Sequence, residues 1–210
     1  MYFVKTPFWL KKWFNHYHWD IETNEQAVYL TFDDGPHPLA TPFVLEQLDR
    51  FNAKATFFCI GKNVAAHKGI YEEILQRGHS VGNHTHNHLN GWKTPHQQYI
   101  NNVDEAARNI TSTLFRPPYG RITKKAGRTL INKGFKVIMW DVLSADFDRT
   151  LSPEKCRDIV IKKSQAGSVI VFHDSQKAFK NLQVALPATL QYFSERGFVF
   201  KNITGNDLKK

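Results

Sequence analysis

The sequence is poor in several features on which whole classes of protein depend. Two of its 210 residues are cysteine, Cys59 and Cys156. These are too few for a disulfide framework or a cysteine-rich zinc site, so we expect both to be buried as small apolar side chains. No apolar run approaches the roughly 18 residues that a membrane span requires. Charged residues make up 22% and apolar residues 41%, a balance that excludes an intrinsically disordered chain.

The start of the chain lacks the marks of an export signal. The stretch 1–14 is apolar and basic, but Lys5, Pro7 and Lys11 interrupt it, and no small-residue cleavage site follows. By sequence we therefore expect the protein to be cytoplasmic or peripheral to a membrane.

The aromatic residues of this stretch allow two structures. They can form an interfacial helix whose rings face lipid, or the same rings can pack onto the domain. The residues concerned are Phe8, Trp9, Trp13 and Phe14. We favour packing onto the domain, because a surface helix normally buries its apolar face against its own protein.

Charge and histidine content give two further clues. The 28 Lys and Arg residues exceed the 19 Asp and Glu residues, for a net charge of +9. This surplus suits an acidic partner such as nucleic acid, an anionic glycan or a membrane surface, but it is not specific. Four of the ten histidines crowd into a window of ten residues: His79, His84, His86 and His88. The clustering of histidines is the more informative of the two.

Short runs of β-branched and aromatic residues alternate with longer amphipathic stretches, which is the pattern of β/α units around a parallel sheet. The expected strands are 27–32, 55–60, 79–82, 114–116, 136–140, 168–172 and 198–200. The expected helices are one that begins at Thr41, those over 70–76, 97–114, 126–132 and 153–165, and a last one that ends at Arg196.

No internal repeat, low-complexity segment or linker divides the chain. We expect one α/β domain over 27–201, preceded by an aromatic and basic segment over 1–26 and followed by a polar tail over 202–210. About seven strands are compatible with either an open doubly wound sheet or a barrel. The sequence has no glycine-rich dinucleotide-binding loop, which would have favoured the open sheet. In both folds the site lies at the carboxyl ends of the strands.

Polar and titratable residues collect at the ends of five expected strands. The five clusters are 33–36, 83–88, 116–120, 141–148 and 173–174. A structural charge pair has no reason to prefer the carboxyl end of a strand. The distribution therefore indicates one site assembled from five loops.

Two of these clusters suit a metal ion. Asp33 and Asp34 repel each other unless a cation or hydrogen-bond donors compensate, although Asp-Gly-Pro is also typical of a solvated turn. His84 and His88, four residues apart, face the same side of a helical turn and can share one metal. If the segment were a strand, His84 and His86 would share a face instead. Two histidines and one carboxylate leave a coordination position open for water.

Arg116 and His173 suit roles in proton chemistry. Beside Asp33 or Asp34, Arg116 would keep a carboxylate ionised and oriented; the alternative is a surface arginine lying over Pro117. His173 directly follows an apolar strand and is either a core histidine or a titratable acid–base group. In the second case Asp146 would raise the pKa of His173 and fix its tautomer.

Taken together, these residues resemble a known family. The segments 31–36, 84–88, 116–120, 141–147 and 171–173 are similar to the five ordered motifs of the NodB-homology polysaccharide deacetylases, which form carbohydrate esterase family four. The resemblance extends over about residues 27–200. It implies a distorted (β/α) barrel of about seven strands and a metal-dependent enzyme that removes acetyl groups from N-acetylated sugars of peptidoglycan, chitin or a related glycan.

The resemblance also implies a metal site and a base. Asp34, His84 and His88 would bind a divalent ion, most often Zn²⁺, with Co²⁺, Ni²⁺ or Mn²⁺ as alternatives. Asp33 would be the general base and Arg116 its orienting partner.

The remaining implied roles concern the leaving group and the substrate pocket. His173 would be the general acid, held in its charged form by Asp146, and the backbone N–H of Tyr119 would contribute to an oxyanion hole. The residues implied to line the substrate pocket are Pro118, Tyr119, Phe147 and Val171.

Three positions depart from the pattern of the family. Phe147 stands where tryptophan is common, Val171 where leucine is common, and Leu143 where a polar residue is frequent. These changes affect the shape of the acetyl pocket and leave the metal and proton-transfer residues intact. The polymer that is deacetylated, the native metal and the oligomeric state stay open.

Two alternatives to an N-deacetylase remain. The first is an O-deacetylase of acetyl esters such as acetylxylan, where the leaving alkoxide needs less help from His173. The second is a non-catalytic protein that binds an anionic glycan or nucleic acid through the positive charge. We expect an N-acetylated glycan as partner and no nucleic acid, with peripheral membrane contact through the first residues as a further option. Analogy with the family favours an exported protein.

Overall fold

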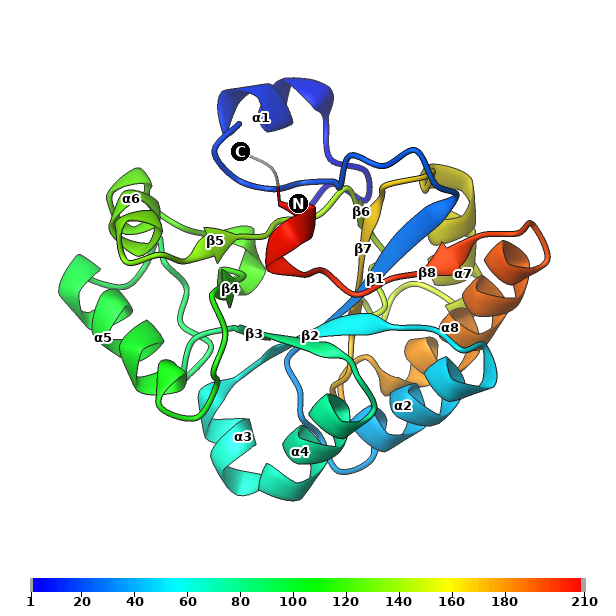
Figure 1. Ribbon diagram of the computed structural model, residues 1–210, viewed down its shortest axis with the longest axis horizontal. Coiled ribbons are helices and arrows are strands. Elements are labelled where there is room, and N and C mark those ends of the chain that lie inside the picture. Colours follow the sequence, from blue (N-terminus) through cyan, green and yellow to red (C-terminus); the bar gives the residue numbers. More distant parts are fainter. Residues whose placement is uncertain (1, 209–210) are drawn as a thin grey trace.

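The computed structural model describes residues 2–208, so Met1, Lys209 and Lys210 lie outside the described residues. Its centre is a sheet of eight strands that pair in parallel. The strands are β1 (Ala27–Asp33), β2 (Ala55–Cys59), β3 (Ser80–Asn83), β4 (Leu114–Phe115), β5 (Lys136–Val137), β6 (Val142–Leu143), β7 (Val169–His173) and β8 (Val199–Phe200). Seven follow the order β5-β4-β3-β2-β1-β7-β6, and β8 pairs with the start of β1. The sheet curls into a half-barrel (Figure 1), which confirms the expected single α/β domain with a distorted barrel.

Helices surround the outer face of the curled sheet (Figure 1). They are α2 (Ala40–Arg50), α3 (Gly61–Ala66), α4 (Lys68–Gln76), α5 (His96–Ala107), α6 (Lys124–Asn132), α7 (Pro153–Lys163) and α8 (Phe179–Ser194). Helix α1 (Phe8–Trp13) precedes the sheet, and two short 3-10 turns are η1 (Pro118–Gly120) and η2 (Gly205–Asp207). Residues at the N-terminus of a helix help to determine where the helix begins, as α7 shows. The Ser152 hydroxyl accepts a hydrogen bond from the third residue of α7, and Pro153 takes the first helical position, where its missing N–H costs nothing.

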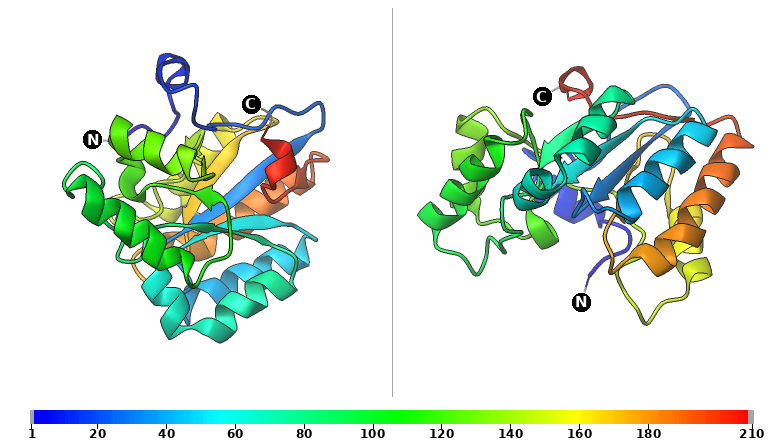
Figure 2. Two further views of the ribbon diagram at one scale, coloured as in Figure 1. Left: turned by 60° about the vertical axis from the view of Figure 1, so that its left-hand side comes forward. Right: turned by 90° about the horizontal axis from the view of Figure 1, so that it is seen from below.

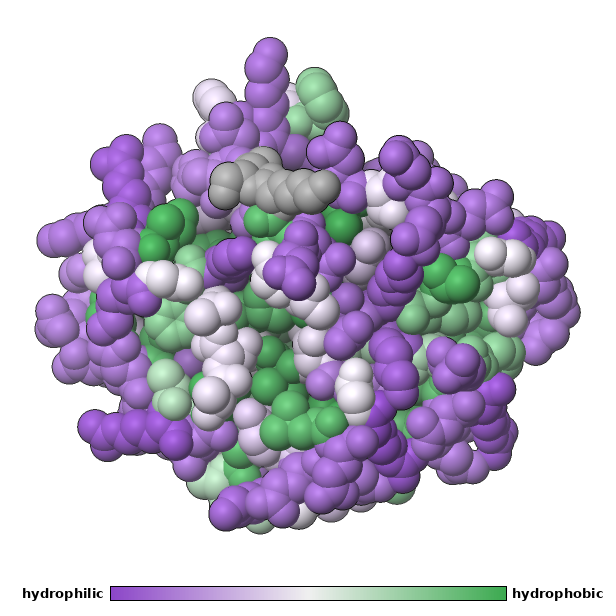
Figure 3. Space-filling view, viewed as in Figure 1, coloured by the Kyte–Doolittle hydropathy of each residue, from purple (hydrophilic) through white to green (hydrophobic). Residues whose placement is uncertain are grey.

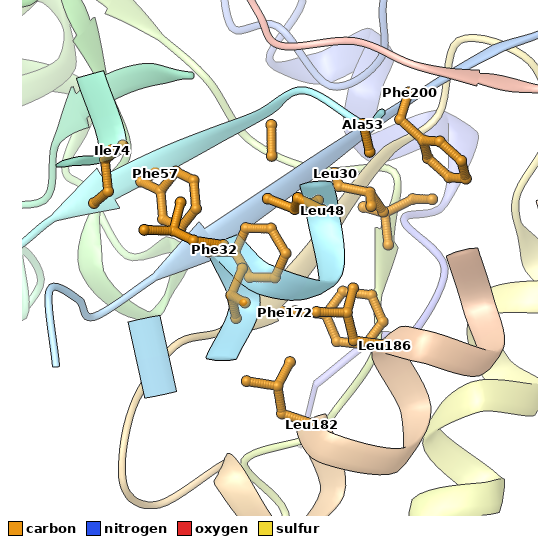
Figure 4. Close-up of a cluster of buried hydrophobic side chains, with 14 of the residues drawn as sticks. Leu30, Phe32, Leu48, Ala53, Phe57, Ile74, Phe172, Leu182, Leu186 and Phe200 are labelled. Atoms are coloured by element: carbon orange, nitrogen blue, oxygen red, sulfur yellow. The ribbon is translucent and has the colours of Figure 1, made fainter. Parts of the chain in front are cut away.

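The largest group of buried side chains lies between the sheet and helices α2 and α8 (Figure 4). Leu30 and Phe32 of β1 project into it together with Leu48 of α2 and Leu186 of α8. Both cysteines are buried in the same group, as expected. Because successive side chains of a strand point to opposite faces, the alternate residues of β1, including Asp33, project to the inside of the barrel.

The N-terminal segment pairs with both outer strands of the sheet. The Thr6 amide donates to the carbonyl of Asp141 at 2.9 Å, just before β6. His18 makes two backbone hydrogen bonds, of 2.9 and 2.7 Å, to residues 137–139 at the end of β5. An unpaired strand edge invites pairing with another chain. The segment therefore covers edges that the half-barrel would otherwise leave open.

Helix α1 projects from the body of the molecule (Figure 2). The Phe14 ring, just after α1, stacks on Tyr17 at 5.9 Å. By contrast, Phe8, Trp9 and Trp13 are 79%, 55% and 76% exposed. The expected packing of four aromatic residues therefore holds for Phe14 and is wrong for the other three. Because α1 has only six residues and contacts the domain on one side, the aromatic side chains on its other sides remain exposed.

The C-terminal segment crosses the end of the barrel where the strands begin (Figure 1). Although its composition is polar, Ile203 and Leu208 are buried with Ala27 and Val169. The space-filling view shows this side of the molecule, with hydrophobic patches at its centre and hydrophilic side chains around them (Figure 3).

Three elements differ from the sequence-based expectation. The strand expected over 136–140 ends at Val137, and a separate strand, β6, follows. The helix expected over 97–114 ends at Ala107, because the chain must turn to bring Leu114 into β4. Helix α3 follows β2 over residues for which no helix was expected. These short elements depend on their neighbours in space, since a strand of two residues has no periodicity of its own.

Candidate active site

The residues predicted to carry chemistry meet at the carboxyl ends of β1, β3, β4 and β7. Asp33, the last residue of β1, is the register partner of His173, the last residue of β7. Residues paired in register project to the same face of a sheet. The predicted base and the predicted acid therefore stand side by side on the inside of the barrel.

Arg116 is buried completely inside the barrel. One terminal nitrogen donates to the Asp33 carboxylate and to the Thr31 hydroxyl, each at 2.7 Å. Its other nitrogens donate to two backbone carbonyls of 138–139, and its guanidinium lies 4.0 Å from the centre of the Phe58 ring. This excludes the surface arginine considered from the sequence. Burial tends to lower the pKa of Arg116, but a buried guanidinium beside a carboxylate stays charged.

Asp34, His84 and His88 form a compact group of ligand atoms. The atoms all lie within 4.8 Å of one another. One Asp34 oxygen is 3.1 Å from Nε2 of His88 and 3.7 Å from Nε2 of His84. Two ligands bound at about 2.1 Å to a tetrahedral ion lie roughly 3.4 Å apart. The group therefore fits a divalent metal.

The tautomer of His84 suits a metal ligand. Its Nδ1 lies 2.8 Å from the carbonyl oxygen of Arg116. Because a carbonyl can only accept, Nδ1 must carry the proton, and Nε2 presents a lone pair toward Asp34. Burial lowers the pKa of His84 to about 4, so the ring is neutral at physiological pH. A neutral imidazole with its far nitrogen hydrogen-bonded is the usual form of a ligating histidine.

Asp34 itself is held in the charged form. Burial alone would raise its pKa, but the hydrogen bond to His88 and the positive charge of His173 outweigh burial and lower the pKa below its usual range. Asp34 also adopts a backbone φ of 82°, a left-handed conformation that is uncommon outside glycine and is found at functional sites.

His173 pairs with Asp146 in two ways. Its Nδ1 lies 2.7 Å from one Asp146 oxygen, and its backbone N–H donates to the other oxygen at 2.8 Å. Burial tends to lower the pKa of His173, but the charge and hydrogen bond of Asp146 outweigh burial and raise it to about 9. His173 is thus protonated at neutral pH, with Nε2 free to donate.

Asp174 holds the loop that carries the two aspartates, a role that the sequence did not reveal. Its two oxygens accept from the Gly35 amide at 3.1 Å and from the Thr41 hydroxyl at 2.6 Å. A Cβ on Gly35 would lie 2.0 Å from the Asp174 carboxylate, so only glycine fits there. Burial raises the pKa of Asp174 to about 8. Asp174 directly follows His173 in the sequence, and no local pattern distinguishes a residue that holds a loop from one that takes part in proton transfer.

Phe147 stands between the site and the N-terminal segment. Its ring centre is 5.1 Å from that of His173 and 5.3 Å from that of Tyr2. The Tyr2 hydroxyl donates to Asp148 at 2.5 Å. Tyr2 is a second site residue that sequence reasoning missed, because 145 positions separate it from Phe147 and no local pattern joins them.

The other residues predicted to line the substrate pocket lie around the same site. Val171 is buried on the face of β7 that carries His173, and Leu143 is its register partner on β6. Pro118 is buried, whereas Tyr119 is 60% exposed with its ring centre 4.6 Å from that of His88.

Two nearby candidates lie outside the group. His86 turns away from the Asp34/His84/His88 group, with Nε2 3.4 Å from Glu105, so the alternative pair of His84 and His86 is wrong. Asp141, in the fourth cluster, lies before β6 and binds Lys5 and Lys11 of the N-terminal segment.

A curled parallel barrel with a carboxylate, a charged histidine and an Asp/His/His group at its carboxyl end defines a hydrolase built on a (β/α) barrel. Residues 20–138 match the family model described as polysaccharide deacetylase. The chain belongs to this family.

Relatives of known function agree with this assignment. A peptidoglycan-N-acetylglucosamine deacetylase of Bacillus cereus is 29% identical over 192 residues, which cover 89% of this chain and 90% of that protein. A chitooligosaccharide deacetylase of Sinorhizobium fredii is 30% identical over 201 residues, with 88% and 93% covered. The crystal structure of a peptidoglycan N-acetylglucosamine deacetylase bound to a naphthalenyl N-hydroxybenzamide superposes with a TM-score of 0.85 at 30% identity, covering 94% of this chain and 95% of that chain.

Proposed function

We propose that this protein is a metal-dependent N-deacetylase that hydrolyses the acetamide of N-acetylated sugars in peptidoglycan, chitin-like or related glycans. The observation that carries the proposal is the juxtaposition of Asp33, His173 and the Asp34/His84/His88 group at one end of the barrel. The similar proteins reported above are named as deacetylases of peptidoglycan N-acetylglucosamine and of chitooligosaccharides, which supports this substrate class.

Asp34, His84 and His88 would hold the metal. Two imidazoles and one carboxylate suit Zn²⁺, with Co²⁺, Ni²⁺ or Mn²⁺ as alternatives. When bound, the ion would polarise the acetyl carbonyl and lower the pKa of water in the site. The N-hydroxybenzamide bound by the structural relative offers two oxygens in a chelating arrangement, so we expect this compound class to bind here when the ion is present.

Asp33 would accept a proton from the attacking water. Arg116 fixes the position of the Asp33 carboxylate by a charged hydrogen bond in a dry environment. As the water oxygen forms its bond to the acetyl carbon, the carbonyl oxygen gains negative charge. The N–H of Tyr119 would donate to that oxygen.

His173 would then complete the cleavage. Breaking the carbon–nitrogen bond sends an electron pair to the sugar nitrogen, which must gain a proton to leave as an amine. A histidine with a pKa of about 9 carries that proton at neutral pH, and His173 is the register partner of Asp33 on the neighbouring strand, which supports a joint role with the base. The products are acetate and a free amino sugar.

The strong His173–Asp146 pair favours an amide over an ester as substrate. An alkoxide leaves from an ester more easily than an amine anion leaves from an amide, so an O-deacetylase needs less help from a general acid. His173→Ala should therefore reduce turnover of N-acetylglucosamine oligomers far more than turnover of acetylxylan. A near-equal loss on both substrates would remove this argument for the amide.

The direct test combines metal analysis with acetate release from chitin oligomers, peptidoglycan and acetylxylan. We expect chelation to abolish release and Asp33→Asn to reduce it at least 100-fold, the usual scale of a general base. Asp33→Asn should retain the metal, because Asp33 is not in the ligand group. Release that survives both chelation and Asp33→Asn would contradict the proposal.

A further inference from the structure

We propose that Trp92 is a stacking platform for a distal sugar ring, so that the site acts on a glycan chain and not on a single sugar. The proposal rests on the proposed function and concerns the substrate of the same site. Trp92 is 63% exposed, whereas a tryptophan of a folded domain usually buries most of its surface.

The loop that carries Trp92 is connected to two loops of the site, one through the chain and one through hydrogen bonds. Trp92 follows the metal-ligand candidate His88 by four residues. The Gly91 amide donates to the carbonyl of Arg121 at 3.1 Å, and the Trp92 indole N–H donates to the carbonyl of Ile122 at 3.2 Å. Four residues span at most about 14 Å, roughly two or three pyranose rings, which places Trp92 within reach of a chain held in the site.

One face of the indole is already occupied, and the side chain is fixed. The Arg121 guanidinium lies 5.2 Å from the centre of the ring, a cation–π contact. With its N–H bonded to Ile122, the ring is held in one orientation and presents its other face to solvent. A preorganised aromatic ring gains affinity because little side-chain freedom is lost on binding.

Tyr119 gives the platform a second ring closer to the metal group. It is 60% exposed, lies against His88 and precedes Arg121 by two residues. Its backbone φ of 61° is a strained conformation for a bulky residue and is typical of functional positions. Pyranose rings expose C–H groups on their faces and hydroxyls at their edges, which suits stacking on exposed aromatic rings. Tyr119 and Trp92 therefore mark successive positions of one unbranched N-acetylated glycan.

The test compares acetate release from N-acetylglucosamine and from its β-1,4-linked tetramer. Trp92→Ala should raise KM for the tetramer about tenfold, equivalent to about 1.4 kcal/mol, with kcat and the activity on the monomer unchanged. Trp92→Phe should restore much of the loss. Trp13→Ala is the control, because Trp13 is a second exposed tryptophan, 76% exposed, and belongs to α1 and not to a loop of the site.

A second measurement separates this proposal from the proposed function. Binding of the tetramer to the Asp33→Asn protein, followed by calorimetry, needs no turnover. Trp92→Ala in that background should weaken tetramer binding about tenfold. Equal binding with and without Trp92, or no tetramer binding at all, would overturn the platform. Failure of the unmodified protein to release acetate while the Trp92 effect on binding persists would overturn only the deacetylase assignment.

A separate observation leads to a second proposal: α1 and α6 rest on an anionic membrane surface. The N-terminal segment exposes Phe8, Trp9 and Trp13 on one short helix. Tryptophan is the aromatic residue most typical of the lipid headgroup region. Within residues 2–208, no helix is long and apolar enough to cross a bilayer. The contact that we propose is made by side chains at the surface of the bilayer.

Positive charge lies beside these aromatic side chains. Lys12 of α1 is exposed, and α6 packs against the same hydrophobic group as Leu10 of α1. Helix α6 carries exposed Lys124, Lys125 and Arg128 and has no acidic residue. Basic residues near a membrane surface are attracted to anionic lipids. Aromatic insertion with flanking basic charge favours an anionic bilayer over a second copy of this basic chain.

Cosedimentation with vesicles tests the membrane contact. The full chain should bind phosphatidylcholine/phosphatidylglycerol (3:1) vesicles at least tenfold better than pure phosphatidylcholine, equivalent to about 1.4 kcal/mol. The double variant Trp9→Ser/Trp13→Ser and the variant Lys124→Glu/Lys125→Glu should each lose this binding, while Trp92→Ala keeps it. Equal binding by the double variant, no vesicle binding by the unmodified chain, or a dimer that dissociates in the double variant would overturn the proposal.

Discussion

Two histidines of the same site titrate in opposite directions. Burial lowers the pKa of His84 to about 4, while Asp146 outweighs burial and raises the pKa of His173 to about 9. The difference lies in their partners: His84 donates to a carbonyl, and His173 to a carboxylate. One ring is thereby suited to a metal and the other to donating a proton, although both are histidines on the inside of one barrel.

The His173–Asp146 pair predicts an alkaline limit to activity. A general acid works only while protonated, so kcat/KM should fall as the pH rises through about 9, the pKa of His173. Asp146→Asn removes the charge that raises this pKa and should move the limit to lower pH by roughly 1 to 3 units. A pH profile of acetate release measures the shift. Asp158→Asn, a surface substitution, serves as control, and an unmoved limit in Asp146→Asn would exclude His173 as the acid.

At the scale of secondary-structure elements, the N-terminal segment is held to the domain by the buried carboxylate of Asp141. Asp141 is buried and accepts from Lys5 and Lys11, each at 2.6 Å, and from the Ser168 hydroxyl at 2.6 Å. Burial tends to raise the pKa of Asp141, but these partners outweigh burial and lower it. The segment that covers the edges of β5 and β6 is therefore fixed by charge as well as by backbone pairing.

Removing both lysine partners should destabilise the fold. Lys5→Met/Lys11→Met leaves Asp141 buried without a cation, which should cost about 3 kcal/mol of unfolding free energy, the lower end for a broken buried pair because the lysines are partly exposed. Urea denaturation measures the loss. Since the pKa of Asp141 is lowered in the folded state, its contribution is present above about pH 4 and is lost as the pH falls through the folded pKa.

Lys12 offers the matched control for this experiment. It neighbours Lys11 on α1 but is exposed, so Lys12→Met should change stability by less than about 0.5 kcal/mol. A destabilisation that is the same at pH 7 and at pH 2.5 would show that the loss comes from packing and not from the charge of Asp141.

For the whole molecule, metal binding should appear as thermal stability. A ligand present at 100 times its Kd stabilises the folded state by about 2.7 kcal/mol, which raises Tm by roughly 5–10 °C in a domain of this size. Scanning calorimetry of chelated protein with and without added Zn²⁺ measures this shift. We expect this stabilisation because Asp34, His84 and His88 come together only in the folded chain, so the ion should bind the folded state and not the unfolded one.

Two variants make the thermal experiment specific. Asp34→Ala should abolish the rise in Tm, because it removes one of the three proposed ligands. His86→Ala should keep the rise, since His86 lies between the proposed ligands His84 and His88 in sequence but faces Glu105. A rise of equal size in Asp34→Ala would place the ion elsewhere on the protein.

Local patterns explain why much of the site could be predicted from the sequence. The spacing of His84 and His88 and the position of Asp33 at the end of an apolar strand are properties of a few neighbouring residues. Parallel strands bring such ends together whatever their order in the sheet. The strands β1, β2 and β7, which carry or adjoin the site, were therefore expected at nearly their observed bounds, while β6 was missed because two residues show no period.

The sequence by itself determined the class of fold, the charged residues at the strand ends and the pairing of His84 with His88, since these depend on short-range periodicity and backbone chemistry. The expected helical turn between the two histidines is wrong, because the segment is a loop in which Thr85 and His88 adopt left-handed backbone conformations. Only the tertiary structure decided that Asp174 locks the loop of the two aspartates, that Tyr2 packs on Phe147, and that three rings of α1 face solvent. Each of these contacts joins residues far apart in the chain or depends on which side of a short helix meets the domain. The energy of such contacts exists only once the barrel has formed.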